Sequence, residues 1–162
     1  AIGHGCVSVV ADVSTAEGVD TAVAAAQREL GGIDIVVANA GGPKPGTFAT
    51  TTADDYPPAL ELNLLSTIRL CEATVPAMRA QRWGRIVAIT SVAAREPMAN
   101  LILSNTARAG VTGFLKTLAL EVAADGVTVN SVLPCMHRFR SMTDPASGCP
   151  RSSEYPVASS RP

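Results

Sequence analysis

The 162-residue sequence has few aromatic side chains, almost no net charge and no long apolar run. Aromatic residues make up 4% of the chain and hydrophobic residues of all kinds 47%, so a core must be built mainly from Ala, Val and Leu. A formal net charge of -1 provides no basic surface for nucleic acid or an anionic membrane. Runs such as 33–38 are far shorter than the ~20 residues of a membrane helix. We therefore expect neither a nucleic-acid partner nor a membrane span.

The sequence also lacks paired cysteines. Cys6, Cys71, Cys135 and Cys149 show no CxxC spacing. Reduced thiols in a cytosolic protein are the simplest interpretation, and a disulfide or a zinc site is the alternative. No charged segment with an apolar stretch and a cleavage site precedes the first strand-like segment, so we expect no signal peptide. These features predict a cytoplasmic protein without a metal site.

What the sequence does contain is a regular alternation of apolar runs and helical patterns. The strand-like segments are 6–11, 33–38, 85–90 and 127–133. The helix-like segments run from a capping-box pattern at Ser14 and Glu17 to Leu30, from Pro57 to about Gln81, and from about Leu103 to Ala124. Strands that alternate with helices predict βα crossovers and a parallel sheet covered on both faces.

The composition changes abruptly after Pro134. Residues 135–162 carry scattered Ser, Pro and Arg without an apolar period, which predicts an unstructured segment. We therefore expect an incomplete domain at 1–134 and a tail at 135–162. An ordinary flexible tail accounts for this change, and so does a shift of reading frame near codon 135. The suddenness of the change favours the frameshift.

Several features then follow one another in a fixed order. They are a strand that ends in Asp12, the triplet Asn39-Ala40-Gly41, Asn63, a strand that ends in Ser91, a long helix, and the strand 127–133. Together they resemble the short-chain dehydrogenase/reductase family, close to its 3-oxoacyl carrier-protein reductase branch. The resemblance implies an α/β fold, a partial Rossmann-like doubly wound parallel sheet that lacks the family's first two strands. It also implies hydride transfer between NAD or NADP and a small-molecule carbonyl or alcohol.

The candidate cofactor-binding residues are Asp12, Asn39, Ala40, Gly41 and, through a ribose hydroxyl, Arg108. The family uses an Asp at the position of Asp12 on the adenine ring, but a helix-capping or turn Asp is equally compatible with the sequence. The small residues after the second strand let a dinucleotide approach the backbone, and a generic tight turn is the alternative.

The family's glycine-rich phosphate loop is not recognisable in this sequence. Gly3 and Gly5 form a GxG pattern, but they precede a strand rather than a helix. Without that loop no helix N-terminus is available to receive the pyrophosphate. We therefore expect weak NAD or NADP binding, or none.

The candidate catalytic residues are Asn63, Ser91, Ser104 and Arg108. In the family, an Asn at the first position bends its helix and holds a proton-relay water, and a Ser at the second hydrogen-bonds the substrate carbonyl. A solvent-facing Asn and an ordinary strand-end Ser are the alternatives. The family then places a Tyr thirteen residues after that Ser and a Lys four residues later. Here these positions hold Ser104 and Arg108, which share one helix face.

These two residue types disfavour the family's ordinary reaction. A nearby cation can lower the pKa of a phenol from about 10 toward neutral pH. The pKa of a serine hydroxyl starts several units higher, and each unit adds about 1.36 kcal/mol to the free energy of ionisation. The planar guanidinium of Arg108 does not replace an ammonium group. The sequence thus predicts an oxidoreductase with impaired turnover. The alternatives are a nonfunctional fragment and a non-catalytic subunit that oligomerises through the helices after the second and third strand-like segments, 33–38 and 85–90, using the apolar face between Ala107 and Leu120.

Overall fold

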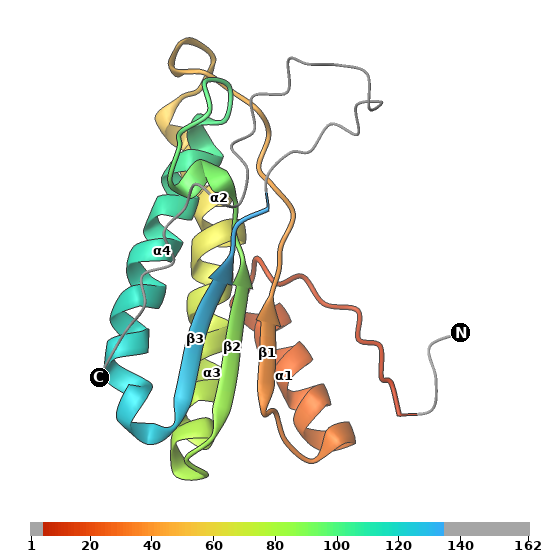
Figure 1. Ribbon diagram of the computed structural model, residues 1–162. Coiled ribbons are helices and arrows are strands. Elements are labelled where there is room, and N and C mark those ends of the chain that lie inside the picture. The colour runs from red at the N-terminus through yellow and green to blue at the C-terminus, as the bar shows by residue number, and fades with distance from the viewer. Residues whose placement is uncertain (1–4, 135–162) are drawn as a thin grey trace, which may run out of the picture.

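The protein is described by a computed structural model that places residues 5–134 (Figure 1). The predicted tail and the frameshift hypothesis fall on 135–162, outside these residues. One parallel sheet has the order β1-β2-β3, with β1 (Ile35–Ala38), β2 (Gly84–Ile89) and β3 (Val127–Val132). The three strands lie within two residues of the predicted ones, and the partial Rossmann-like α/β fold is confirmed.

Helices connect the strands in the predicted places. They are α1 (Ala16–Leu30), α2 (Tyr56–Leu60), α3 (Ser66–Ala80) and α4 (Ile102–Val122). A π-helical segment, η3 (Glu61–Leu65), joins α2 to α3. Short 3-10 turns are η1 (Phe48–Thr50), η2 (Ala53–Asp55), η4 (Val92–Ala94) and η5 (Ala123–Asp125). No helix among residues 5–134 is long and apolar enough to cross a membrane.

The start of α1 differs from the prediction. Thr15 is the N-cap, and its hydroxyl oxygen accepts from the backbone N–H of Gly18 at 3.0 Å. The hydroxyl of Ser14 instead donates to the carboxylate of Asp12 at 2.7 Å, because a charged acceptor forms the stronger hydrogen bond. The predicted capping box with Ser14 as cap is therefore wrong. The end is as predicted, with Gly31 in the left-handed conformation at φ 80°.

The predicted first strand, 6–11, does not form. The segment leads away from the sheet without a strand partner among the described residues, and Val7, Val9 and Val10 are exposed (Figure 1). An extended segment becomes a strand only when a neighbour accepts and donates its backbone hydrogen bonds. In the doubly wound order 3-2-1-4, two further strands would lie between this segment and β1.

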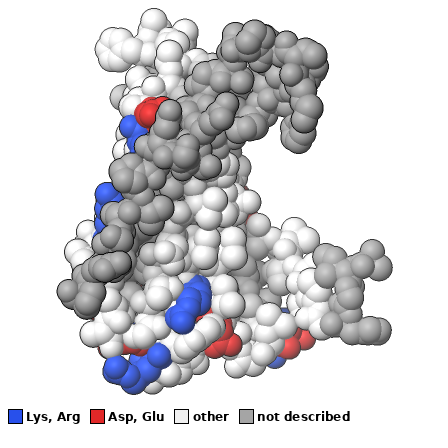
Figure 2. Space-filling view, viewed as in Figure 1, with Lys and Arg blue, Asp and Glu red and all other residues white. Residues whose placement is uncertain are grey.

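The described helices α3 and α4 pack on one face of the sheet, so the predicted cover on both faces is wrong for this part of the chain. Val36 and Ala38 of β1 point into the core, whereas Ile35 and Val37 point away, and the side chain of Val37 is 60% exposed. The uncovered part of the opposite face is mostly uncharged in Figure 2. The helix α1 packs against α3.

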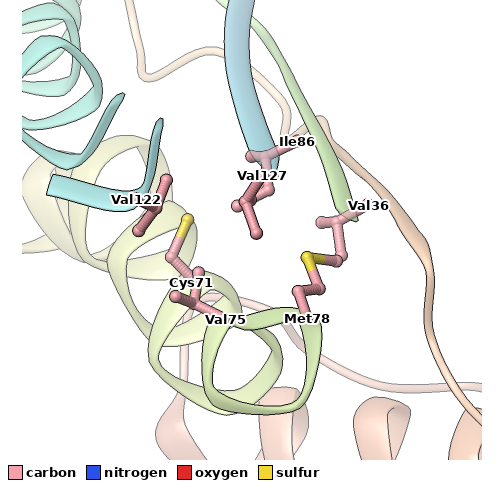
Figure 3. Packing of buried hydrophobic residues seen from close by; sticks show 7 residues of the cluster. All are labelled: Val36, Cys71, Val75, Met78, Ile86, Val122 and Val127. Atoms are coloured by element: carbon pink, nitrogen blue, oxygen red, sulfur yellow. The ribbon is translucent and has the colours of Figure 1, made fainter. Parts of the chain in front are cut away.

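The main core lies between the sheet and α3 (Figure 3). Its buried members are aliphatic or sulfur-containing, as the shortage of aromatic residues predicted, and are Val36, Cys71, Val75, Met78, Ile86, Val122 and Val127. A second cluster toward the carboxyl ends of the strands contains Ala38, Ala88, Val111 and Leu115. Gly84 at the start of β2 leaves the space that the Met78 side chain fills.

The core predicts a large effect for Met78→Ala. The Met78 side chain is 0% exposed, and its removal leaves a cavity between α3 and β2. We expect the free energy of unfolding to fall by about 2–5 kcal/mol in urea titrations. Leu120→Ala, at an exposed position of α4, is the control and should change it by less than about 0.5 kcal/mol. Equal effects of the two substitutions would contradict this core.

Candidate active site

The candidate site forms where the three parallel strands end side by side. Ala38 of β1 is in register with Ala88 of β2, and Ile89 is in register with Val132 of β3. Just beyond, the backbone N–H and the hydroxyl of Thr90 both donate to the carbonyl of Val132, at 2.8 and 3.1 Å. The carboxyl ends of parallel strands are where ligands bind in open α/β sheets.

Asn39, Ala40 and Gly41 follow β1 directly at this edge. Asn39 and Gly41 are exposed, and nothing lies within 4 Å of the position that a Cβ atom on Gly41 would take. A ligand can therefore approach the backbone here without a side chain in the way. The predicted position is thus observed, and cofactor binding by these residues stays a prediction.

The loop after this triplet returns to the start of α4, a contact that sequence reasoning missed. The N–H of Gly46 donates to the carbonyl of Asn100 at 2.8 Å, and the N–H of Ile102 donates back to Gly46 at 3.2 Å. These bonds form an isolated parallel bridge between Gly46 and Leu101. The loop is thereby fixed close to the first turn of α4, which carries Ser104.

Ser91 lies just past the end of β2 and caps η4. Its hydroxyl oxygen accepts from the backbone N–H of Ala93 at 3.1 Å. The cap fixes the position of the oxygen and leaves the hydroxyl proton available for an acceptor. Ser91 is therefore oriented as a hydrogen-bond donor at the strand edge.

Asn63 is buried inside the π-helical segment η3. Its side chain is 1% exposed, so the solvent-facing alternative is wrong. Neither the amide oxygen nor the amide nitrogen has a hydrogen-bond partner among residues 5–134. A buried amide normally finds partners, because leaving it unpaired costs about 1–3 kcal/mol. Asn63 is thus equipped to hold a water or a ligand group, and π-helical turns are frequent at functional sites.

Arg108 is directed into the molecule. The residue is 8% exposed, and its Nη1 donates to the carbonyl of Ile89, the last residue of β2, at 3.0 Å. Burial lowers the pKa of Arg108, because the charged form loses water. Ser104 lies one helical turn earlier on α4 and is half-buried. The predicted shared helix face therefore adjoins the end of β2, close to Ser91.

Asp12 is engaged with its own turn. Its carboxylate accepts from the N–H of Ser14 at 2.9 Å and from the Ser14 hydroxyl, and these bonds lower the pKa of Asp12. The Asp12 backbone also approaches Gly18 so closely that a Cβ atom there would collide with it. Arg69 of α3 holds the turn through the Ser14 carbonyl at 3.1 Å. The structure favours the turn interpretation of Asp12, and its contact with adenine stays a prediction.

A hollow next to this region was not predicted. Its volume is about 430 Å³, and its lining residues are Gly42, Pro43, Lys44, Asp55, Pro58, Ala59, Leu62 and Leu103. Lys44 and Asp55 form an ion pair at 2.6 Å within it. Asp55 also accepts from the N–H of Thr52 at 2.9 Å, and the two contacts, with that of Lys44 the stronger, lower the pKa of Asp55 to about 2. The spacing of Thr52 and Asp55, typical of a capping box, was the signal that could have revealed this anchor.

The possible metal ligands and the thiols that the structure describes are those of residues 5–134 only. No group of three His, Cys, Asp or Glu side chains that could hold a metal occurs in the described part of the chain. Cys71 is buried, and burial raises the pKa of its thiol to about 12, which keeps it uncharged and unreactive. Cys6 is exposed, and Cys135 and Cys149 lie outside the described residues.

A parallel α/β sheet with small and polar residues at its carboxyl edge defines the class of Rossmann-like ligand-binding folds. The sequence profile of the short chain dehydrogenase family matches residues 1–147, and the chain belongs to that family. The 3-oxoacyl acyl-carrier-protein reductase of Vibrio cholerae is 37% identical over 123 residues, which are 76% of this chain and 50% of the relative. The short-chain reductase protein NovJ of Streptomyces niveus is 38% identical over 132 residues, 82% of this chain and 48% of the relative.

Solved structures agree with this assignment. L-sorbose reductase from Gluconobacter frateurii, in complex with NADPH and L-sorbose, is 36% identical and superposes with a TM-score of 0.73. The match covers 78% of this chain and 48% of the reductase. The chain spans about half the length of the relatives it matches.

The Lys44–Asp55 pair predicts a pH-dependent stability. The pKa of Asp55 in the folded chain, about 2, lies below the ordinary value of 3.8, so the carboxylate stabilises the fold above that value and ceases to do so as the pH falls toward 2. Asp55→Asn should therefore lower the thermal midpoint at neutral pH, and the difference from the parent chain should shrink between about pH 4 and pH 2. Asp54→Asn makes the same charge change on the exposed neighbour. A pH-independent effect of Asp55→Asn would refute the pairing.

Proposed function

We propose that this site belongs to an NAD(P)-dependent oxidoreductase acting on a small-molecule carbonyl or alcohol, and that turnover in this chain is impaired. Family membership supports the reaction class, and the NADPH complex of the sorbose reductase supports the cofactor class. A bound nicotinamide would supply or accept the hydride. In this proposal the hydroxyl of Ser91 donates a hydrogen bond to the substrate oxygen, from the position fixed by its cap.

The observed residues fit a dinucleotide only in part. The open backbone at Gly41 suits a close approach. The carboxylate of Asp12, however, is engaged by Ser14, and Nη1 of Arg108 is engaged by the carbonyl of Ile89. To bind a cofactor with these same atoms, Asp12 would have to release Ser14 and Nη1 of Arg108 would have to release Ile89. We therefore propose weak NAD or NADP binding, or none.

Proton transfer to or from the substrate oxygen is the second step that we propose to be impaired, because Ser104 and Arg108 occupy the positions of the family's Tyr and Lys. A serine hydroxyl cannot be ionised near neutral pH by a neighbouring cation, and Nη1 of Arg108 is already engaged by the carbonyl of Ile89. Ser104, Arg108 or a water would have to transfer the proton. A water held by the unpaired amide of Asn63 is one candidate, because neither amide atom has a hydrogen-bond partner among the described residues.

The double substitution Ser104→Tyr with Arg108→Lys tests this account. It restores a phenol and an ammonium one helical turn apart, so reduction of a panel of ketones by NADPH should rise about 100-fold or more, the usual contribution of a general acid. The readout is NADPH oxidation by the purified full chain. Addition of Ser91→Ala should abolish the gain. A folded double variant that is no faster than the parent chain would show that these two positions do not limit turnover.

A non-catalytic, oligomerising subunit is the second candidate. Ala107, Val111 and Leu115 from the apolar face proposed for association are buried in the chain's own core, so that part of the face is occupied. Leu120 on the same helix is 85% exposed and remains available for a partner. A nonfunctional fragment is the third candidate, which the activity assay addresses.

Association through Leu120 predicts a concentration-dependent mass. Light scattering of the parent chain should show a dimer or larger species that weakens on dilution, and Leu120→Glu should shift the population to the monomer, because the carboxylate cannot be buried unpaired. Glu121→Gln, on the adjacent exposed position, is the matched control. A parent chain that stays monomeric at all concentrations would eliminate this candidate.

A further inference from the structure

Arg108 is a buried cation without a buried anion. Only 8% of the residue is exposed, and no carboxylate of the described residues lies within ion-pair distance of it. By contrast, those arginines of the described residues that do form ion pairs with Asp or Glu are more exposed, for example Arg69, which pairs with Glu61 at 2.7 Å. A buried charge is normally paired, because its removal from water is costly unless an opposite charge compensates.

The guanidinium of Arg108 is also only half used. Nη1 donates to the carbonyl of Ile89, but Nε is enclosed and has no hydrogen-bond partner among residues 5–134. Nη2 likewise makes no hydrogen bond to a described residue. Nε and Nη2 form the side of the guanidinium that binds both oxygens of a carboxylate or phosphate through two parallel hydrogen bonds. That side is the one left without partners.

Two serine hydroxyls come from the segments that adjoin Arg108 in the chain and at the strand end. Ser104 is one helical turn before Arg108 on the same face of α4. Ser91 follows Ile89 by two residues, and its hydroxyl proton is not used by its cap. The bond between Arg108 and Ile89 ties the helix to this strand end. One buried cation and two free hydroxyl protons are the components of an oxyanion receptor.

We propose that Arg108, with Ser104 and Ser91, binds the oxyanion of a small molecule, a carboxylate or a phosphate group, side-on through Nε and Nη2. The ligand's negative charge compensates the buried guanidinium and satisfies the orphaned Nε. Arg108 then keeps its bond to Ile89 and acts as an anion receptor at the strand edge. This binding requires neither the nicotinamide cofactor nor turnover, so it stands or falls separately from the oxidoreductase proposal.

Calorimetric titration of the purified full chain with oxalate and with inorganic phosphate tests this site. Sodium chloride at equal ionic strength provides the reference, because chloride has no pair of oxygens. We expect saturable binding of at least one oxyanion, and the two titrations distinguish a carboxylate receptor from a phosphate receptor. Arg108→Gln should weaken binding about tenfold or more, the effect of losing a hydrogen bond to a charged group. Lys116→Gln removes an exposed cation from the same helix and should leave binding unchanged.

Arg108→Lys provides a second test that keeps the charge. It removes the paired side-on geometry, so the affinity should fall by several-fold while circular dichroism shows a folded chain. The proposal is overturned if the parent chain binds neither oxyanion beyond the chloride reference. It is equally overturned if Arg108→Lys, or a folded Arg108→Gln, binds as tightly as the parent chain, or if Lys116→Gln abolishes binding.

Discussion

The parallel pairing of β1, β2 and β3 is the constraint on which the rest of the structure depends. The register of the three strands decides which residues meet at their carboxyl ends, and it brings the segments after Ala38, Ile89 and Val132 to one edge. The helices follow from this arrangement, since each crossover must return the chain to the start of the next parallel strand. Every candidate residue of the site except Asp12 and Asn63 is at this edge or on the helix that leaves it.

Arg108 links α4, on which it lies, to the end of β2 beside the candidate site. Its bond to Ile89 anchors α4 to the end of β2, so Nη1 is engaged within the chain while Nε has no hydrogen-bond partner among the described residues. A lysine ammonium at this position would be a compact charge on a flexible stem, whereas the guanidinium is a rigid fork that holds a carbonyl on one side. The substitution therefore changes the architecture of the site as well as its acid–base chemistry.

The sequence predicted the elements whose signals are local. Three strands, the helical stretch from Pro57 to about Gln81 and α4 were found within a few residues because apolar periodicity, Pro57 and the glycines are local signals. The π-helical interruption in that stretch was not predicted. The strand predicted at 6–11 does not form, because a strand requires a neighbouring strand for its backbone hydrogen bonds, and a local sequence pattern does not show whether one is present. The site was predicted by position, but its geometry was not. The inward turn of Arg108, the burial of Asn63 and the Lys44–Asp55 anchor depend on contacts between distant segments.

Weak or absent binding of NAD or NADP is the central proposal for this chain. Calorimetric titration of the purified chain with NADPH measures this property without requiring turnover. We expect no detectable heat of binding, or an affinity in the millimolar range, because Oδ1 of Asp12 and Nη1 of Arg108 are engaged by partners within the chain. Binding in the micromolar range or tighter would contradict it.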